Sequence, residues 1–284
     1  MIIKTDLREK AMTVALNISC WSARKFDKAV TKRIHEDFGV EGKEAGRFNK
    51  LLVEKAAIKA IETARNNCYT FHYANTLPWG KGITILKATN YENYATEMGK
   101  LEEAYWAEVE VFLARYTRLI ERAKERLGGM FKKDDYPHPA VIRGKFRFNV
   151  SYQPLAGSDD WRVNLSAKQV QDLAAKTAER ERELLASSMK EAWQRLYDVI
   201  KHAVDKLGKA DAIFRDSLIG NVVKQCEILP MLNLEDDPEL EKMRKAVLSS
   251  VGRLDPAMLR EDPEGRKRAA KEAESILKKL DGYF

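Results

Sequence analysis

Cysteine is scarce in this sequence, with three residues among 284. Cys20, Cys68 and Cys226 lie far apart, and an odd number of cysteines at wide spacing does not form the disulfide framework of a small secreted domain. We therefore expect the chain to work in a reducing compartment.

Long hydrophobic runs are also missing. A membrane-spanning helix needs about 20 consecutive apolar residues, and no window of the sequence approaches that length. The first residues, MIIKTDLREKAMTVAL, carry charges on both sides of their apolar stretch and lack the hydrophobic region of a signal peptide. Together these absences predict a soluble protein with no membrane partner and a cytoplasmic location.

The motifs that mark common enzyme classes are absent as well. A Gly-Lys pair at positions 42–43 is followed by Glu44, where a phosphate-binding loop needs Ser or Thr to reach Mg²⁺. The chain has neither a glycine-rich dinucleotide-binding pattern nor a serine flanked by glycines in a nucleophile elbow. The sequence thus predicts no catalytic residue, no cofactor and no enzymatic activity of the chain alone.

One pair of residues has the spacing of metal ligands. Cys68 and His72 lie four positions apart in a predicted helix, but a zinc site needs about four ligands. The other histidines and cysteines show no arrangement that would complete the set. We expect no metal site, and we interpret the pair as an ordinary thiol and a histidine near a helix end.

Positive charge is concentrated in the front half of the chain. Residues 1–150 carry 27 Lys and Arg against 19 Asp and Glu, a balance of +8, whereas residues 151–284 carry 23 against 24. Such asymmetry is compatible with a face that binds a polyanion, and equally with a solvated surface that matches an acidic partner.

The densest basic stretch lies close to the N-terminus, next to Trp21 and Phe26. A helix is predicted at about residues 27–37, and Lys25, Lys28 and Lys32 have the spacing of one helical face, as contacts to phosphates require. Three acidic residues in the same stretch weaken the signal. The candidate nucleic-acid contacts are Arg24, Lys25, Lys28, Lys32 and Arg33.

Hydrophobic periodicity predicts a mainly α fold with a small antiparallel β part. Apolar residues at spacings of three and four indicate helices, and alternation indicates short strands. The predicted helices cover about residues 27–37, 46–73, 91–127, 166–207, 211–229 (ended by Pro230), 237–251 and 262–281. The predicted strands cover about residues 13–19, 83–87, 146–151 and 161–165, the last two paired across a turn at 157–160.

The two longest predicted helices, 91–127 and 166–207, suggest an antiparallel hairpin. A β-bearing excursion at 130–165 separates them, and a rise of about 1.5 Å per residue makes a coiled-coil-like arm of about 50 Å. The chain would then comprise a basic α/β segment (1–88), the hairpin (89–208) and a C-terminal helical segment (209–284).

The second half of the 166–207 helix carries a nearly heptad seam. We expect the seam to be buried, either on the 101–127 helix or on another subunit. This candidate assembly seam consists of Met189, Trp193, Leu196, Ile200, Ala203 and Leu207.

Several strings, spread over nearly the whole chain, resemble an uncharacterised family of bacterial and phage proteins, a domain of unknown function. The strings are LNISCWSARK, NTLPWGKGITILKATNY, DDYPHPAVIRGKFRFNVSYQPL, DDWRVNLS, FRDSLIGNVVKQCEILPMLNLEDDPELEKMR and RLDPAMLREDPEGR. The resemblance implies a gene near those of MoxR-type AAA+ ATPases and of proteins with a von Willebrand factor A domain. It brings no catalytic motif, so no residue takes a role from it.

Three functional hypotheses follow. The first is a non-enzymatic assembly or adaptor protein of phage or bacterial origin, a homo-oligomer that works with an AAA+ ATPase or another protein partner. The alternative is a nucleic-acid-binding protein that uses the basic N-terminal half. An enzyme ranks third, because an active site assembled from scattered residues leaves no trace in one sequence.

Overall fold

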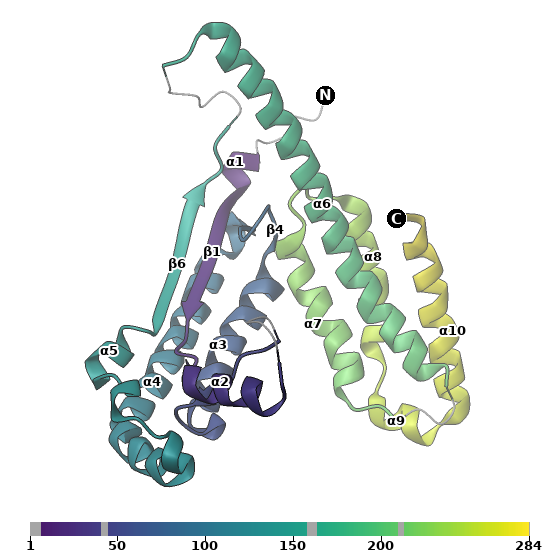
Figure 1. The fold of residues 1–284 in the computed structure, drawn as a ribbon. Helices are drawn as coiled ribbons and strands as arrows, with labels where there is room; N and C mark the ends of the chain where they lie inside the picture. Colours follow the sequence, from purple (N-terminus) through teal and green to yellow (C-terminus); the bar gives the residue numbers. More distant parts are fainter. Residues whose placement is uncertain (1–6, 41–44, 158–163, 210–212, 284) are drawn as a thin grey trace. The chain divides into compact units, whose positions relative to one another are not determined.

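The computed structural model describes residues 7–40, 45–157, 164–209 and 213–283. The chain is 70% helical with a small antiparallel sheet (Figure 1), which confirms the predicted fold class. Among the described helices, none combines the length and the apolar character that crossing a membrane requires.

The chain divides into two compact units, each built from separate stretches of sequence. Unit 1 comprises Met1–Ala15, His72–Ala95 and Ser151–Phe284, and unit 2 comprises Leu16–Phe71 and Thr96–Val150. These units differ from the three consecutive segments expected from the sequence, because four elements run from one unit into the other. The four are β1 (Ala11–Ser19), α3 (Lys55–Asn75), α4 (Tyr91–Leu127) and β6 (Arg147–Pro154).

The two longest helices have the bounds that the sequence predicted. Ser166 caps the first turn of α6 through a reciprocal pair, in which its hydroxyl accepts from the Gln169 amide and the Gln169 side chain accepts from the Ser166 amide. α6 spans Ala167–Leu207. The other described α-helices are α1 (Leu7–Lys10), α2 (Lys28–Asp37), α5 (Pro139–Arg143), α7 (Ser217–Leu232), α8 (Pro238–Ser249), α9 (Pro256–Glu261) and α10 (Pro263–Leu280).

Three predicted helix boundaries were wrong. The helix expected from about residue 211 begins only at Ser217, because residues 213–216 are not helical. The helix expected from residue 46 begins only at Lys55, because residues 49–51 form a strand whose apolar neighbours mimicked helical spacing. Pro230 does not end α7, which continues to Leu232. Proline has no N–H to donate to the carbonyl of Cys226, and a guanidinium N–H of Arg244 donates to that oxygen instead at 3.5 Å.

The larger sheet has the strand order β4-β5-β1-β6, with β4 at Leu77–Pro78 and β5 at Thr84–Lys87. β1 and β5 pair antiparallel from Ala11↔Lys87 to Val14↔Thr84. The strands predicted at 13–19, 83–87 and 146–151 are therefore present. Most of the strand predicted at 161–165, and its turn, lie outside the described residues.

The core of unit 1 forms around the predicted seam. All six seam residues are buried, and they share one hydrophobic cluster with residues of α7, α8 and α10. Within its unit α6 packs chiefly against α10 and α7. The expected hairpin, with α4 as the partner of α6, is not confirmed, because α7 and α10 of the same chain already cover the seam.

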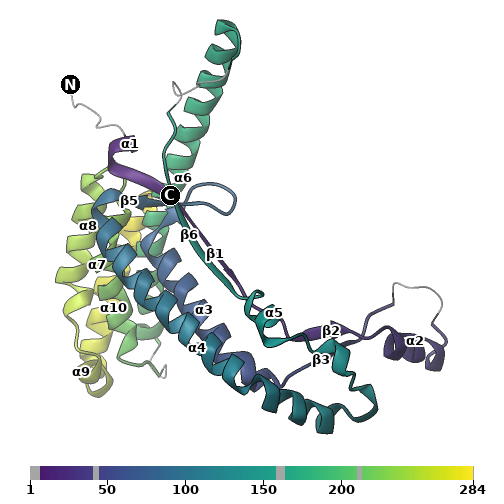
Figure 2. The same ribbon diagram turned by 90° about the vertical axis from the view of Figure 1, so that its left-hand side faces the viewer.

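The core of unit 2 is an aromatic cluster on α4. The ring of Phe112 lies 6.0 Å from that of Trp21, 5.8 Å from that of Tyr116 and 6.0 Å from that of Phe146, measured between centroids. Helices α3 and α4 run side by side in this unit (Figure 2). The cluster fixes the loop that follows β1, because Trp21 belongs to that loop.

Candidate nucleic-acid interface

The five predicted nucleic-acid contacts lie on two consecutive elements of unit 2. Arg24 and Lys25 belong to β2 (Arg24–Phe26), which pairs antiparallel with β3 (Asn49–Leu51), and the other three belong to α2. All five side chains are exposed. We call this set (Arg24, Lys25, Lys28, Lys32 and Arg33) the basic surface.

Local hydrogen bonds fix α2 to the β2–β3 ribbon. Asp27 caps the helix, its Oδ1 accepting from the Val30 amide at 3.1 Å. The hydroxyl of Thr31 donates to the Asp27 carbonyl at 2.7 Å and accepts from the Phe48 amide at 3.0 Å. The helix predicted at 27–37 is thereby confirmed, but the single helical face expected for Lys25, Lys28 and Lys32 is not, because the pairing of β2 with β3 makes Lys25 part of a strand.

A buried ionic network lies beneath the basic surface. The Lys50 ammonium contacts Asp27 Oδ2 at 3.0 Å and Asp135 Oδ2 at 2.6 Å, and it donates to the Met130 carbonyl at 2.8 Å. Three partners match the three N–H groups of an ammonium. The hydrogen bond from Lys50 lowers the pKa of Asp27. Burial opposes the charge of Lys50, but the hydrogen bonds with Asp135 and Asp27 outweigh it and raise the Lys50 pKa.

The exposed cations differ in how far their charge is already neutralised. Lys32 pairs with Glu36 at 3.3 Å and Arg33 with Asp37 at 3.8 Å, but exposed pairs of this kind contribute little free energy and yield to a stronger anion. Within the described residues, the other three members of the basic surface form no ion pair. The surface therefore keeps a net positive character despite its acidic neighbours.

Exposed apolar side chains accompany the cations. Phe26 is 44% exposed, Ile34 40% and Phe38 80%, and the Arg47 guanidinium lies 5.8 Å from the centroid of the Phe26 ring. Aromatic rings beside cations are the combination on which nucleic-acid bases stack. Phe38 was not among the predicted contacts, although an aromatic residue at the end of a basic helix was a signal that the sequence carried.

A groove of about 470 Å³ adjoins the basic surface within unit 2. We call it the loop groove, because residues 20–23, between β1 and β2, line it together with Arg24 at the start of β2. Lys55, Glu62 and Arg65 of α3 line the opposite wall. Sequence reasoning missed Lys55 and Arg65, because they lie 31 and 41 positions after Arg24 and only the fold brings them to it.

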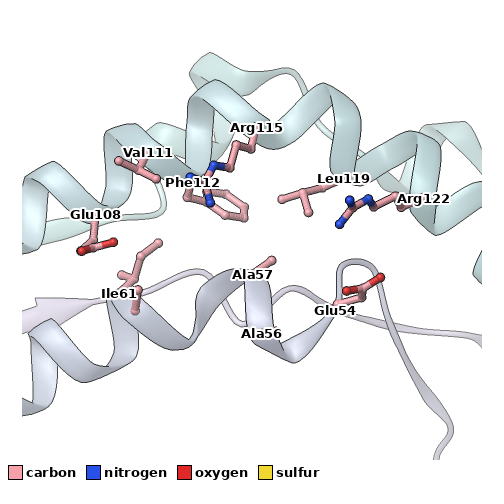
Figure 3. Close-up of a pocket in the computed structure, with 11 residues that line it drawn as sticks. Glu54, Ala56, Ala57, Ile61, Glu108, Val111, Phe112, Arg115, Leu119 and Arg122 are labelled. Carbon is pink, nitrogen blue, oxygen red and sulfur yellow. The ribbon is translucent and has the colours of Figure 1, made fainter.

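A second groove of about 250 Å³ lies between α3 and α4 (Figure 3). Phe112 and Leu119 point from α4 toward Ala57 of α3. Its charged lining consists of Glu54, Glu108, Arg115 and Arg122. Two acidic and two basic side chains balance each other, so this groove has no electrostatic preference for an anion, unlike the loop groove.

The side chains of Cys68 and His72 are engaged in separate hydrogen bonds. The Cys68 thiol donates to the Ala64 carbonyl at 3.1 Å, and burial raises its pKa to about 11. His72 Nε2 lies 3.2 Å from the Thr84 hydroxyl, whose proton goes to the Val14 carbonyl, so Nε2 carries the ring proton. Nδ1 then accepts from the Tyr94 hydroxyl at 2.6 Å, and burial lowers the His72 pKa to about 4.

We expect one cysteine to dominate the reaction with a thiol probe at neutral pH. The thiolate is the reactive form, and burial raises the pKa of Cys68 to about 11 and that of Cys226 to about 12. Cys20 is only partly buried and lines the loop groove. Iodoacetamide should modify Cys20 at least tenfold faster than Cys68 and Cys226, and peptide mass spectrometry measures the three rates. Equal rates for the three would contradict the packing described for α3 and α7.

Within the part of the chain that the structure describes, no group of three or more His, Cys, Asp or Glu side chains could hold a metal ion. The described site therefore offers cations, aromatic rings and a groove.

In our comparisons the chain matches no family model, no curated protein and no solved structure.

Proposed function

We propose that this chain is a non-enzymatic protein that binds nucleic acid through the basic surface. The observation that supports the proposal is the exposure of all five predicted cations on β2 and α2, next to Phe26 and Phe38. Phosphate contacts by Lys and Arg supply most of the affinity of such proteins. The two aromatic rings would add stacking on bases, which tolerates any sequence.

The ionic network below the basic surface favours a binding role for the cations over that of a solvated surface. Lys50 ties α2, β3 and the turn at Asp135 together below the surface, so the backbone that carries the cations is already in place when no ligand is present. Binding to a preorganised surface costs less conformational entropy than binding to a flexible basic tail.

We expect the affinity to depend steeply on salt. Five phosphate contacts predict a slope of about −4 to −5 for log K against log salt on duplex, and about −3.5 on single strands. Reversing three charges, in Lys25→Glu/Lys28→Glu/Lys32→Glu, should remove most of the binding near 50 mM salt. Fluorescence anisotropy with labelled single and double strands measures both quantities.

The control is a triple variant with the same change in net charge, Lys190→Glu/Lys271→Glu/Lys279→Glu. These three lysines are exposed on α6 and α10 of unit 1 and form no ion pair within the described residues. The control should bind nearly as tightly as the natural sequence. Equal losses in both triple variants would mean that only net charge matters, and no binding to either kind of strand would end the proposal.

An assembly or adaptor role is our second proposal. None of residues 167–187, the first half of α6, is buried, and half-buried Val170, Leu173, Ala174 and Thr177 recur at helical spacing there. Such a stripe favours contact with another chain. Light scattering should give a mass above that of one chain, and ATP turnover should appear only after a MoxR-type AAA+ ATPase is added. A monomer that leaves the turnover of such an ATPase unchanged would contradict this role.

A further inference from the structure

We infer that the loop groove receives one nucleotide of a single strand whose neighbouring phosphates lie on the basic surface. The inference rests on the proposed function and narrows it to single-stranded nucleic acid. It adds two contacts, Lys55 and Arg65, that belong to a different element from the five on β2 and α2.

The charge of the groove lining selects an anion. Arg24, Lys55 and Arg65 line it together with a single acid, Glu62. Lys55 is the first residue of α3, where the unpaired amides of a helix start add a partial positive charge. Among the described residues, the Arg65 guanidinium donates to the neighbouring Asn66 side chain alone, at 3.1 and 3.3 Å, which leaves donors for a phosphate.

The groove is continuous with the basic surface. Arg24 belongs to both sets, and the next residues of β2 and α2 carry the other cations. Because side chains alternate along a strand, Arg24 shares its face of β2 with Phe26 and not with Lys25. A strand whose base stacks on Phe26 would therefore bring its next phosphate to Arg24. The volume of about 470 Å³ is of the size that holds one small ligand, and a base-paired duplex could not enter it.

The loop wall of the groove is rigid. Trp21 packs 6.0 Å from Phe112 and 5.9 Å from Tyr116, and the Leu52 amide donates to the Ala23 carbonyl at 2.8 Å. Ala23 is buried and has a φ of +51°, a left-handed conformation that is unfavourable for residues other than glycine. The surrounding contacts hold this conformation, as is common at ligand-binding loops.

Cys20 provides a direct probe of occupancy, because its half-buried thiol lines the groove. The experiment measures the rate of iodoacetamide labelling of Cys20 in the full chain, with and without a saturating (dT)10 oligonucleotide. AMP, inorganic phosphate and a ten-base-pair duplex serve as separate probes. Cys20→Ala shows which part of the signal comes from this thiol. We expect (dT)10 to slow the labelling at least fivefold and the duplex to leave it unchanged.

The matched variants neutralise two charges inside or outside the groove. Lys55→Gln/Arg65→Gln removes two lining cations, whereas Lys59→Gln/Lys124→Gln removes two exposed cations of α3 and α4 that do not line it. One single-strand phosphate contact is worth about a factor of five at 0.1 M salt. We expect the groove variant to lose about 25-fold in affinity for (dT)10 and none for duplex, and the control to lose less than twofold.

The outcomes separate this inference from the proposed function. If (dT)10 binds but does not protect Cys20, and the groove variant binds as the control does, the groove assignment is wrong and the basic surface stands. Protection by AMP or phosphate without protection by (dT)10 would overturn the strand path and assign the groove to a free nucleotide or anion. Absence of any binding to (dT)10 and duplex in anisotropy removes the proposed function and this inference together.

Discussion

Replacing Ile200 with glutamate is expected to abolish the folded state of unit 1. Ile200 is fully buried in the middle of the α6 seam, in the cluster shared with α7 and α10. An unpaired carboxylate in such a site either stays charged at a large cost in free energy or takes up a proton, also at a cost. Either cost is comparable to the whole stability of a typical domain. Circular dichroism and limited proteolysis should show lost helix and rapid cleavage within α6, α7 and α10.

Two further variants make the result specific to burial. Ile200→Ala should fold with a free energy of unfolding lower by about 2 to 5 kcal/mol, the range for large-to-small changes in a core. His202→Glu, two positions away on the exposed face of α6, should change it by less than about 0.5 kcal/mol. Because the seam is covered within one chain, the loss of stability in Ile200→Ala relative to the natural sequence should not depend on protein concentration. A folded Ile200→Glu variant would show that the packing of α6 is not as described.

The seam also shows where sequence reasoning ends. Its spacing predicted burial and its bounds predicted the helix, because both depend on residues close together in the chain. The spacing does not identify the partner. α10 offers an equally regular apolar stripe in Ala269, Ala273, Ile276 and Leu280, all buried, and choosing it over the 101–127 helix requires the tertiary fold.

The wrong start of α3 has a similar cause. Phe48, Leu51 and Leu52 fit helical spacing, but hydrogen bonds to β2, 25 positions earlier, make residues 49–51 a strand. Long-range pairing overrides local pattern in such short segments. Pro230 is the reverse case, since tertiary packing of α7 outweighs a local helix breaker.

The candidate site was predictable only in its local part. The five cations of the basic surface lie within ten positions of one another, so one helix and one strand place them together. Lys55 and Arg65, and the network of Lys50 with Asp27 and Asp135, combine residues separated by up to 108 positions, and no spacing in one sequence relates them.

Replacing Lys50 with methionine is expected to lower the free energy of unfolding by about 3 to 5 kcal/mol at neutral pH, because it leaves two carboxylates, buried Asp27 and largely buried Asp135, without their cation. Amide hydrogen exchange should show that α2 loses protection first, since Asp27 caps that helix. Urea unfolding followed by circular dichroism measures the loss. A loss below about 1 kcal/mol would mean that the network contributes little.

The triple variant Lys50→Met/Asp27→Asn/Asp135→Asn removes the stranded charges together with the cation. It should recover much of the loss, because asparagine still caps α2 and an uncharged site no longer carries the desolvation cost. If the triple variant were as unstable as Lys50→Met alone, the loss would come from packing of the lysine stem and not from the unpaired carboxylates.

The network's contribution to the free energy of unfolding is expected to fall both in acid, through Asp27, and in base, through Lys50. The Asp27 pKa is lowered in the folded state, so its contribution is complete above the unfolded value of about 3.9 and is lost as pH falls through the folded pKa. The Lys50 pKa is raised, so its contribution is complete below about 10.4 and is lost as pH rises through the folded pKa. The advantage of the natural sequence over the triple variant should therefore be largest between about pH 4 and pH 10.

Unfolding at pH 3 and at pH 7 tests the loss of the Asp27 contribution in acid. Protonated carboxylates no longer need the cation, so the stability lost in Lys50→Met should be smaller at pH 3 than at pH 7. A deficit of equal size at both pH values would mean that Asp27 is not stabilised as an anion by Lys50.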